Sequence, residues 1–537
     1  MQDKPIWEPG TERIDHANLS RFMRFARGHH PHADFHDYRA LHDFSIRSPD
    51  KFWQLVWDFC GIKASGDHER VLVDAHDMQG ARWFPDVRLN FAQNLLRFSD
   101  DRTALLFRGG NGLTQEFTYA QLHEQVGSLT AALKERGVGV GDRVAGFLPN
   151  HPAAVIAMLA TTALGAVWSS CSPGLAIDDA ANRLGRIRPK LLFCADGFAC
   201  GGKRFDCRES VLAALENGHG IECVVMVPHL DPTPSIDGLR DAILLPDFVA
   251  AHAGIAPEFV PTPFDHPLCM THSVGATGAP NCIVHGAGGT LLEHLKELVL
   301  HTDLRREDRI FCHVAPAGMT WNWLVSSLAV GATIVLHDGD PMHPDANALW
   351  DLVDDCGVSI FGASAEWIGA SEKAGAKPAE THRLSALRTI LATDSPLAPE
   401  SFDYVYRDVK ERVMLASMPG DATLLSSFAL GCPILPVWRG EVQCRGLGMA
   451  VQVLDDDGTS LREAIGELAC VAPFPSMPIG FQDDADGSKY RAACFERHPG
   501  AWCDGNRARL TEHDGVVICG GSDAEPFRRV QELVAAP

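Results

Sequence analysis

The chain has 537 residues, too long for one ordinary hydrophobic core, so two or more subdomains are expected. Its composition, with 46% hydrophobic and 22% charged residues, is that of a globular protein. The 47 basic and 69 acidic side chains give a formal net charge of −22. This charge argues against nucleic acid or an anionic membrane surface as a partner, because both need a cationic face.

The N-terminus and the cysteines predict a cytoplasmic location. The opening residues MQDKPIWEPG carry charges and two prolines where a secretory signal needs an apolar run. The longest apolar stretch, residues 153–168, is too short to span a bilayer and predicts a buried helix. Sixteen cysteines without a C-x-x-C pair fit reduced thiols better than a disulfide framework.

Strand-like and helical segments alternate along most of the chain. RVAGFLPN predicts a strand and PAAVIAMLATTALGAVW the helix after it, while ATIVLHDGD predicts another strand that ends in a turn. This alternation predicts an α/β fold with mostly parallel sheets. After about Pro433, short runs such as MAVQVLD, GELACVA and GVVICGG are separated by Asp-Gly turns and predict a small β subdomain.

A glycine-containing loop lies between two of these segments. The strand-like PLCM is followed by THSVGATGAP and then by the helical TLLEHLKELVL, whose Leu291, Leu292, Leu295 and Leu298 share one face. Such a loop can present backbone N–H groups to an anion. Many strand-to-helix turns contain glycine, so a tight turn without a ligand is an equally good interpretation.

Several longer segments then narrow the possibilities. MQGARWFPDVRLNFAQNLL, SALRTILATDSPLAPESFDYVYRDVK, GCPILPVWRGEVQCRGLGMAV and DGSKYRAACFERHPGAWC resemble the acetoacetyl-CoA synthetases of the adenylate-forming superfamily. The resemblance implies enzymes that form an acyl-adenylate from ATP and a carboxylic acid, then transfer the acyl group to CoA. It also implies a large N-terminal domain with two α/β sheets and a β-barrel, and a small C-terminal domain.

Five parts are expected on this basis. They are an N-terminal helical extension (1–85), a first α/β subdomain (86–260), a second α/β subdomain with the phosphate loop (261–432), a small β-barrel subdomain (433–523) and a tail (524–537). Because the chain ends at Pro537, we expect the small C-terminal domain, with the lysine that the family uses for adenylation, to be absent.

Departures from the family pattern fall on the ATP site. Where the family has SSGTTGLPK, residues 273–281 read SVGATGAPN; SGGTD becomes PGDAT at 419–423, and WCHGD becomes WCDGN at 502–506. A phosphate clamp needs donors and positive charge, and one missing stabiliser costs about two to three decades in rate. The residues still expected to line the pocket are Ser273, Gly275, Thr277, Gly278, Trp321 and Asn506.

New polar residues occupy other positions of the same pattern. Histidine replaces tyrosine at His272, aspartate replaces glycine at Asp394 and Asp421, and Asp504 replaces a histidine. We predict that these four form a new polar site for acid–base or metal-assisted chemistry. Glu366, in place of a lysine, is expected to line the same pocket. The alternative is that they are solvated or helix-capping residues, and no metal ligand set is assigned.

Three functions are compatible with these observations. The first is an enzyme that has lost ATP-dependent adenylation and is repurposed for ATP-independent chemistry on a small carboxylate or acyl thioester. The second is a non-catalytic pseudoenzyme that binds a ligand or a protein partner at the surface left by the missing domain, and the third is a weak acid–CoA ligase helped by another chain. Whether the chain is an enzyme stays open; no cofactor is predicted, ATP and Mg²⁺ are expected to bind poorly, and CoA binding is undecided.

Overall fold

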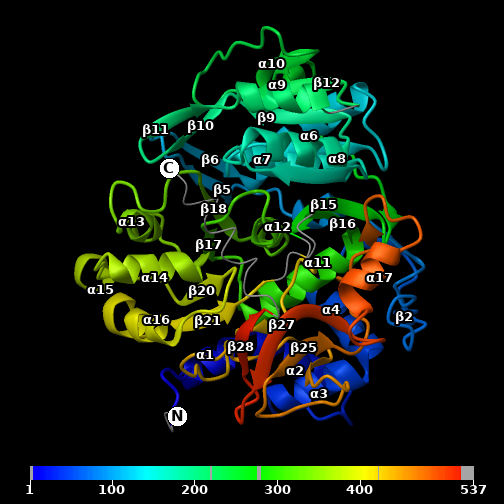
Figure 1. The fold of residues 1–537 in the computed structure, drawn as a ribbon, viewed down its shortest axis with the longest axis vertical. Helices are drawn as coiled ribbons and strands as arrows, with labels where there is room; N and C mark the ends of the chain where they lie inside the picture. The colour runs from blue at the N-terminus through cyan, green and yellow to red at the C-terminus, as the bar shows by residue number, and fades with distance from the viewer. Residues whose placement is uncertain (1–3, 218–219, 275–279, 421–422, 522–537) are drawn as a thin grey trace.

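In the computed structural model, which describes residues 4–217, 220–274, 280–420 and 423–521, two large sheets and a four-stranded sheet organise the chain (Figure 1). The first large sheet has the strand order β13-β12-β9-β7-β8-β15-β16-β26. Strands β13 to β15 of this order are parallel, and β16 and β26 each run antiparallel to the strand before. The bounds are β13 (Ala242–Leu244), β12 (Cys223–Val227), β9 (Leu191–Ala195), β7 (Arg143–Phe147), β8 (Val167–Cys171), β15 (Pro267–Val274), β16 (Pro280–Gly286) and β26 (Gly480–Phe481).

The second large sheet has the order β21-β20-β19-β17-β18-β5-β6. All of its strands are parallel except β6, which is antiparallel to β5. The bounds are β21 (Met414–Met418), β20 (Thr389–Thr393), β19 (Ile360–Ser364), β17 (Arg309–Cys312), β18 (Thr333–His337), β5 (Thr103–Arg108) and β6 (Thr114–Thr118).

The third sheet is antiparallel, in the order β24-β25-β27-β28. Its bounds are β24 (Val451–Leu454), β25 (Gly466–Cys470), β27 (Trp502–Leu510) and β28 (Val516–Gly521). Strands β24, β25 and β28 lie within the runs MAVQVLD, GELACVA and GVVICGG, where the sequence predicted short strands. The predicted α/β fold with mostly parallel sheets is confirmed.

The helices cover the sheets and connect their parallel strands. Those used below are α2 (Asn18–His29), α3 (Tyr38–Arg47), α6 (Tyr119–Glu135), α7 (Pro152–Ala163), α8 (Ile177–Ile187), α11 (Ala287–Lys296), α12 (Met319–Val325) and α14 (Ala365–Lys373). A π-helical turn, η2 (Glu297–His301), continues α11. None of the helices in the described ranges is long and apolar enough to cross a membrane.

Local sequence explains why two of these helices form where they do. Pro152 opens α7, where a missing N–H costs nothing, and His151 Nδ1 accepts a hydrogen bond from the Ala153 N–H. In α11 and η2, the predicted leucine face is buried in the main core. Figure 1 shows α11 near the middle of the molecule, so its polar side chains also have to be buried.

Candidate functional site

Several polar residues follow the carboxyl ends of parallel strands, and we call them the strand-end region. They are Asn150 after β7, His313 after β17, Asp394 after β20, and Pro419 with Gly420 after β21. In open α/β sheets, ligands bind outside the carboxyl ends of the strands. The strand-end region is therefore the candidate site.

Asp394 is the carboxylate that the second sheet presents at this edge. Its backbone φ is 69°, a left-handed conformation that aspartate tolerates better than most residues. The side chain reaches solvent, yet the surrounding protein desolvates it and raises the pKa of the carboxyl above its ordinary value. Asp394 can therefore take up a proton more readily than a free aspartate, or bind a cation.

The backbone beside Asp394 is closely packed. Strands β20 and β21 are neighbours, so Pro419 and Gly420 leave the sheet next to Asp394. A Cβ atom at Gly420 would lie 2.3 Å from the Met319 Cε atom. A larger residue at this position would have to displace the end of the Met319 side chain, so glycine fits here without rearrangement.

A buried hydrogen bond joins the two large sheets at the strand-end region. Trp321, on α12, is fully buried, and its Nε1–H donates to Asn150 Oδ1 at 3.1 Å. Figure 1 shows α12 between the two sheets. Trp321 was predicted to line the pocket, and in the structure its buried indole holds Asn150 at this edge.

A buried histidine–aspartate contact makes a second connection between the sheets. His229 follows β12 of the first sheet and Asp338 follows β18 of the second, and their Nε2 and Oδ2 atoms are 2.6 Å apart with both side chains 1% exposed. The Gly110 N–H donates to the other carboxylate oxygen of Asp338 at 2.8 Å. The carboxyl ends of both sheets are thus held in one arrangement.

His272 lies on β15 of the first sheet and is half-buried. Burial, and then the positive charges of Arg183 and Arg186 on α8, lower the pKa of its imidazole to about 4. The ring is therefore neutral at physiological pH. Within the described residues its Nε2 atom has no hydrogen-bond partner, and no hydrogen bond or ion pair joins it to Asp394.

The remaining predicted site residues divide into two groups. Glu366 is exposed in the first turn of α14, two residues after β19, and Asn506 is half-buried on β27. Outside the described residues lie Gly275, Thr277, Gly278 and Asp421, together with the side chains of Ser273 and Asp504. Among the described residues, no group of three or more metal-ligating side chains is assembled. Because Asp421 and the side chain of Asp504 lie outside them, the four-residue polar site stays a prediction.

Sequence reasoning missed Asn150 and His313. Burial, and then the nearby His337, lower the pKa of His313 to about 4, so this ring is also neutral. Asn150 ends the predicted strand-like run RVAGFLPN, and His313 follows the apolar residues Ile310, Phe311 and Cys312; a polar residue at the end of such a run is the signal that could have identified them.

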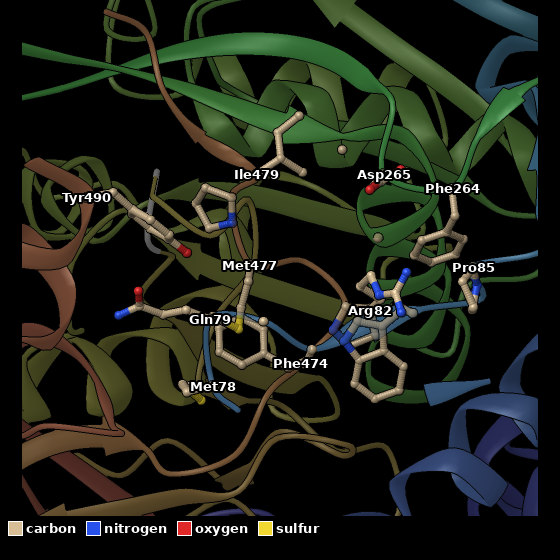
Figure 2. A pocket seen from close by; sticks show the side chains of 17 residues that line it. Met78, Gln79, Arg82, Pro85, Phe264, Asp265, Phe474, Met477, Ile479 and Tyr490 are labelled. Atoms are coloured by element: carbon tan, nitrogen blue, oxygen red, sulfur yellow. The ribbon is translucent and has the colours of Figure 1, made fainter. Parts of the chain in front are cut away.

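A separate cavity of about 330 Å³ lies at the other end of the β15–β16 hairpin. Figure 2 shows Arg82, Phe264 and Asp265 at one end, Tyr490 and Gln79 at the other, and Phe474 with Met477 between them. Eight residues of β15, roughly 25 Å of strand, separate this cavity from the glycine loop. None of the predicted site residues lines it.

Comparisons with known protein families and with individual relatives agree on one family for this chain. The AMP-binding enzyme family matches residues 91–472, and the acetyl-coenzyme A synthetase N-terminus family matches residues 38–95. An acetoacetyl-coenzyme A synthetase of Rhizobium meliloti is 44% identical over 97% of this chain and 80% of its own length. The rat acetoacetyl-CoA synthetase is 40% identical over 97% of this chain and 79% of its own.

A solved structure agrees with these sequences. The acetoacetyl-CoA synthetase from Streptomyces lividans superposes with a TM-score of 0.92 at 40% identity, over 97% of this chain and 80% of that one. This likeness confirms the predicted α/β fold with mostly parallel sheets.

These matches overturn the functional prediction. We predicted a protein that has lost ATP-dependent adenylation, either a repurposed enzyme or a truncated, degenerate pseudoenzyme. The AMP-binding match contradicts this prediction, as do the acetoacetyl-CoA synthetases that align with 97% of the chain. The prediction that the chain uses no cofactor, and that ATP and Mg²⁺ bind poorly, is wrong for the same reason.

The error lies in treating each altered side chain as a lost activity. Phosphate groups are held largely by backbone N–H groups of glycine loops and helix N-termini, and a changed side chain leaves these groups in place. A single missing side-chain donor slows a reaction by about two to three decades and does not abolish it. An asparagine at position 506 can still accept a hydrogen bond where the family has aspartate.

Proposed function

This chain belongs to the AMP-binding enzyme family, among its acetoacetyl-CoA synthetases, and we propose that it is an ATP-dependent ligase that joins acetoacetate to coenzyme A. The observation that carries the proposal is the match over 97% of the chain at 44% identity. It is supported by two sheets whose carboxyl ends are fixed to each other by the Trp321–Asn150 and His229–Asp338 contacts.

The proposed reaction has two steps. The acetoacetate carboxylate attacks the α-phosphorus of ATP, forming acetoacetyl-adenylate and releasing pyrophosphate. The CoA thiol, losing its proton, then attacks the activated carbonyl carbon, and AMP leaves. Both steps need the phosphate groups and the acyl group to be held in a fixed geometry, which is what a rigid strand-end region provides.

Mg²⁺ bound with ATP requires few protein ligands. It usually keeps several waters and takes one or two carboxylates besides the substrate phosphates. Asp394 and Glu366 are exposed carboxylates that follow neighbouring strands, so they fit this requirement. Mg²⁺ would neutralise charge on the phosphates, and Asp394, whose pKa burial raises, would be kept ionised beside the cation.

Other sequence-based assignments remain proposals. We propose that Asn506 and His272 border the nucleotide and acyl groups, with Ser273, Gly275, Thr277, Gly278, Asp421 and Asp504 on the same side. The predicted domain boundaries, an additional protein partner and a cytoplasmic location also stay predictions. The last is supported by sixteen cysteines that are all free.

The test is a direct assay with purified protein, Mg·ATP, CoA and acetoacetate. We expect AMP, pyrophosphate and acetoacetyl-CoA in equal amounts, with the thioester identified by mass spectrometry. Omission of each substrate in turn is the control. Malonamate is a useful competitor, because a malonamoyl-CoA synthetase from Penicillium aethiopicum is 33% identical over 90% of this chain. No AMP formation that depends on acetoacetate would overturn the proposal.

A further inference from the structure

Three ionisable side chains are buried together at the junction of α11 and η2. Lys296 Nζ lies 2.5 Å from Glu293 Oε1 and 3.5 Å from Glu297 Oε1, and all three side chains are at most 1% exposed. We call these residues the buried ion cluster. Nothing in the proposed chemistry uses them directly.

The buried ion cluster contacts one specific segment, residues 425–427. The Ser426 hydroxyl donates to Glu297 Oε1 at 2.5 Å, and the Ser427 N–H donates to the same oxygen at 3.4 Å. Glu293 Oε1 lies 3.4 Å from the Ser426 hydroxyl. Two consecutive serines therefore depend on this cluster for their orientation.

His294, between the cluster residues, holds the same segment. Its Nε2 atom is 2.8 Å from the Leu425 carbonyl oxygen, which can only accept, so Nε2 carries the proton. Nδ1 then accepts from the Ser326 hydroxyl at 2.8 Å. Burial lowers the pKa of His294 to about 4, in agreement with a neutral ring. The helix thus fixes residues 425, 426 and 427 in succession.

Ser427 extends this support to the strand-end region. Its hydroxyl lies 2.8 Å from the Pro419 carbonyl oxygen and 2.7 Å from that of Ala429, and its single proton can be donated to either. Pro419 is the first residue after β21 and is followed by Gly420, which packs on Met319. The contacts therefore run from the buried ion cluster through Ser427 to the backbone beside Asp394.

Stability alone does not explain a buried ion cluster. Burying an ion pair costs about several kcal/mol of desolvation per ion, and well-packed apolar residues in its place often stabilise a protein as much as the pair does, or more. Here the second carboxylate oxygens of Glu293 and Glu297 also lack partners within the described residues. The charged side chains provide directional hydrogen bonds to Glu297 Oε1, which apolar residues could not provide.

We propose that the buried ion cluster, with Ser426 and Ser427, positions the backbone at Pro419 and Gly420, beside Asp394, for adenylation of the substrate carboxylate. Ser426 and Ser427 are positioning residues that touch no substrate. The inference rests on the proposed ligase activity, and it adds to that activity a buried support for the strand-end region.

The test compares Ser426→Ala and Ser427→Ala with Ser45→Ala. Ser45 is a matched control, since its buried hydroxyl also bonds two backbone groups, the His42 carbonyl at 2.7 Å and the Gly448 N–H at 2.9 Å, far from the strand-end region. Acetoacetate-dependent exchange of pyrophosphate into ATP should fall about 10- to 100-fold in the Ser426 and Ser427 variants, as expected for misplaced groups. The KM for CoA and the urea midpoint should match those of Ser45→Ala.

Hydrogen exchange of residues 414–430 supplies a readout that does not need activity. Ser426→Ala and Glu297→Gln should raise the exchange rate there about tenfold relative to the wild type, and Ser45→Ala should not. Equal activities of the Ser426, Ser427 and Ser45 variants would overturn the inference, as would unchanged exchange. If the wild type lacks acetoacetate-dependent exchange, the ligase proposal fails, and the hydrogen exchange alone then decides whether the cluster holds this segment.

Discussion

Replacing Glu293 with glutamine should change how the stability of this protein depends on pH. Burial, only partly offset by the charge of Lys296, raises the pKa of Glu293 from 4.5 to about 7. Because the folded state binds this proton more tightly than the unfolded state, the carboxyl stabilises the fold fully below pH 4.5 and loses this effect as the pH rises through 7. Between pH 5 and pH 8 most of this stabilisation is lost, on the order of 2 to 3 kcal/mol.

Glutamine keeps the shape and the acceptor oxygen at position 293 but cannot ionise. All other titrating groups are shared by the two proteins, including Glu297 and Lys296, which face position 293. The free energy of unfolding, measured in urea at pH 5 and pH 8, should therefore fall more in the wild type than in Glu293→Gln, by on the order of 2 to 3 kcal/mol. Equal changes in both proteins would refute the reasoning, because they would show that Glu293 does not titrate in this range.

Three further outcomes can be checked. Gly289→Ala should lower the free energy of unfolding in urea by about 3 kcal/mol or more, because its Cβ would lie 1.9 Å from the Pro475 carbonyl oxygen. Gly28→Ala, whose Cβ would have nothing within 4 Å, should raise it by up to about 1 kcal/mol. Trp321→Phe removes the donor to Asn150, so it should lower the free energy of unfolding by about 1–3 kcal/mol. It should also lower kcat more than it raises KM, and an unchanged kcat would argue against a role for this contact. Chelation of Mg²⁺ should abolish AMP formation and excess Mg²⁺ should restore it, while a chelator-insensitive rate would exclude the proposed metal use.

The sequence pattern was sufficient for most of the fold. Period-two and apolar runs identified β7, β18, β24, β25 and β28, and the leucines of α11 identified a buried face. These are local signals that tertiary packing reinforces. The order of strands in each sheet is a long-range property and could not be read from them.

The candidate site was only partly predictable. Asp394 and Glu366 were identified by comparison with the family pattern, and both follow strands of the second sheet. Trp321 was assigned to the pocket because of its motif, but its hydrogen bond to Asn150 could not be predicted from the sequence. Which atom a buried polar side chain contacts depends on a partner from another sheet, and periodicity carries no information about that partner.

The cysteines give the folded molecule a simple chemical signature. Of its sixteen thiols, only Cys200 and Cys519 are exposed, and Cys60 is half-buried. A maleimide should therefore label two sites rapidly, one on the hairpin formed by β10 (Gly197–Cys200) and β11 (Lys203–Asp206) and the other on β28, and reach the buried thiols only when their cores open. Counting labelled thiols by mass would then report, in one spectrum, how much of each preparation is folded.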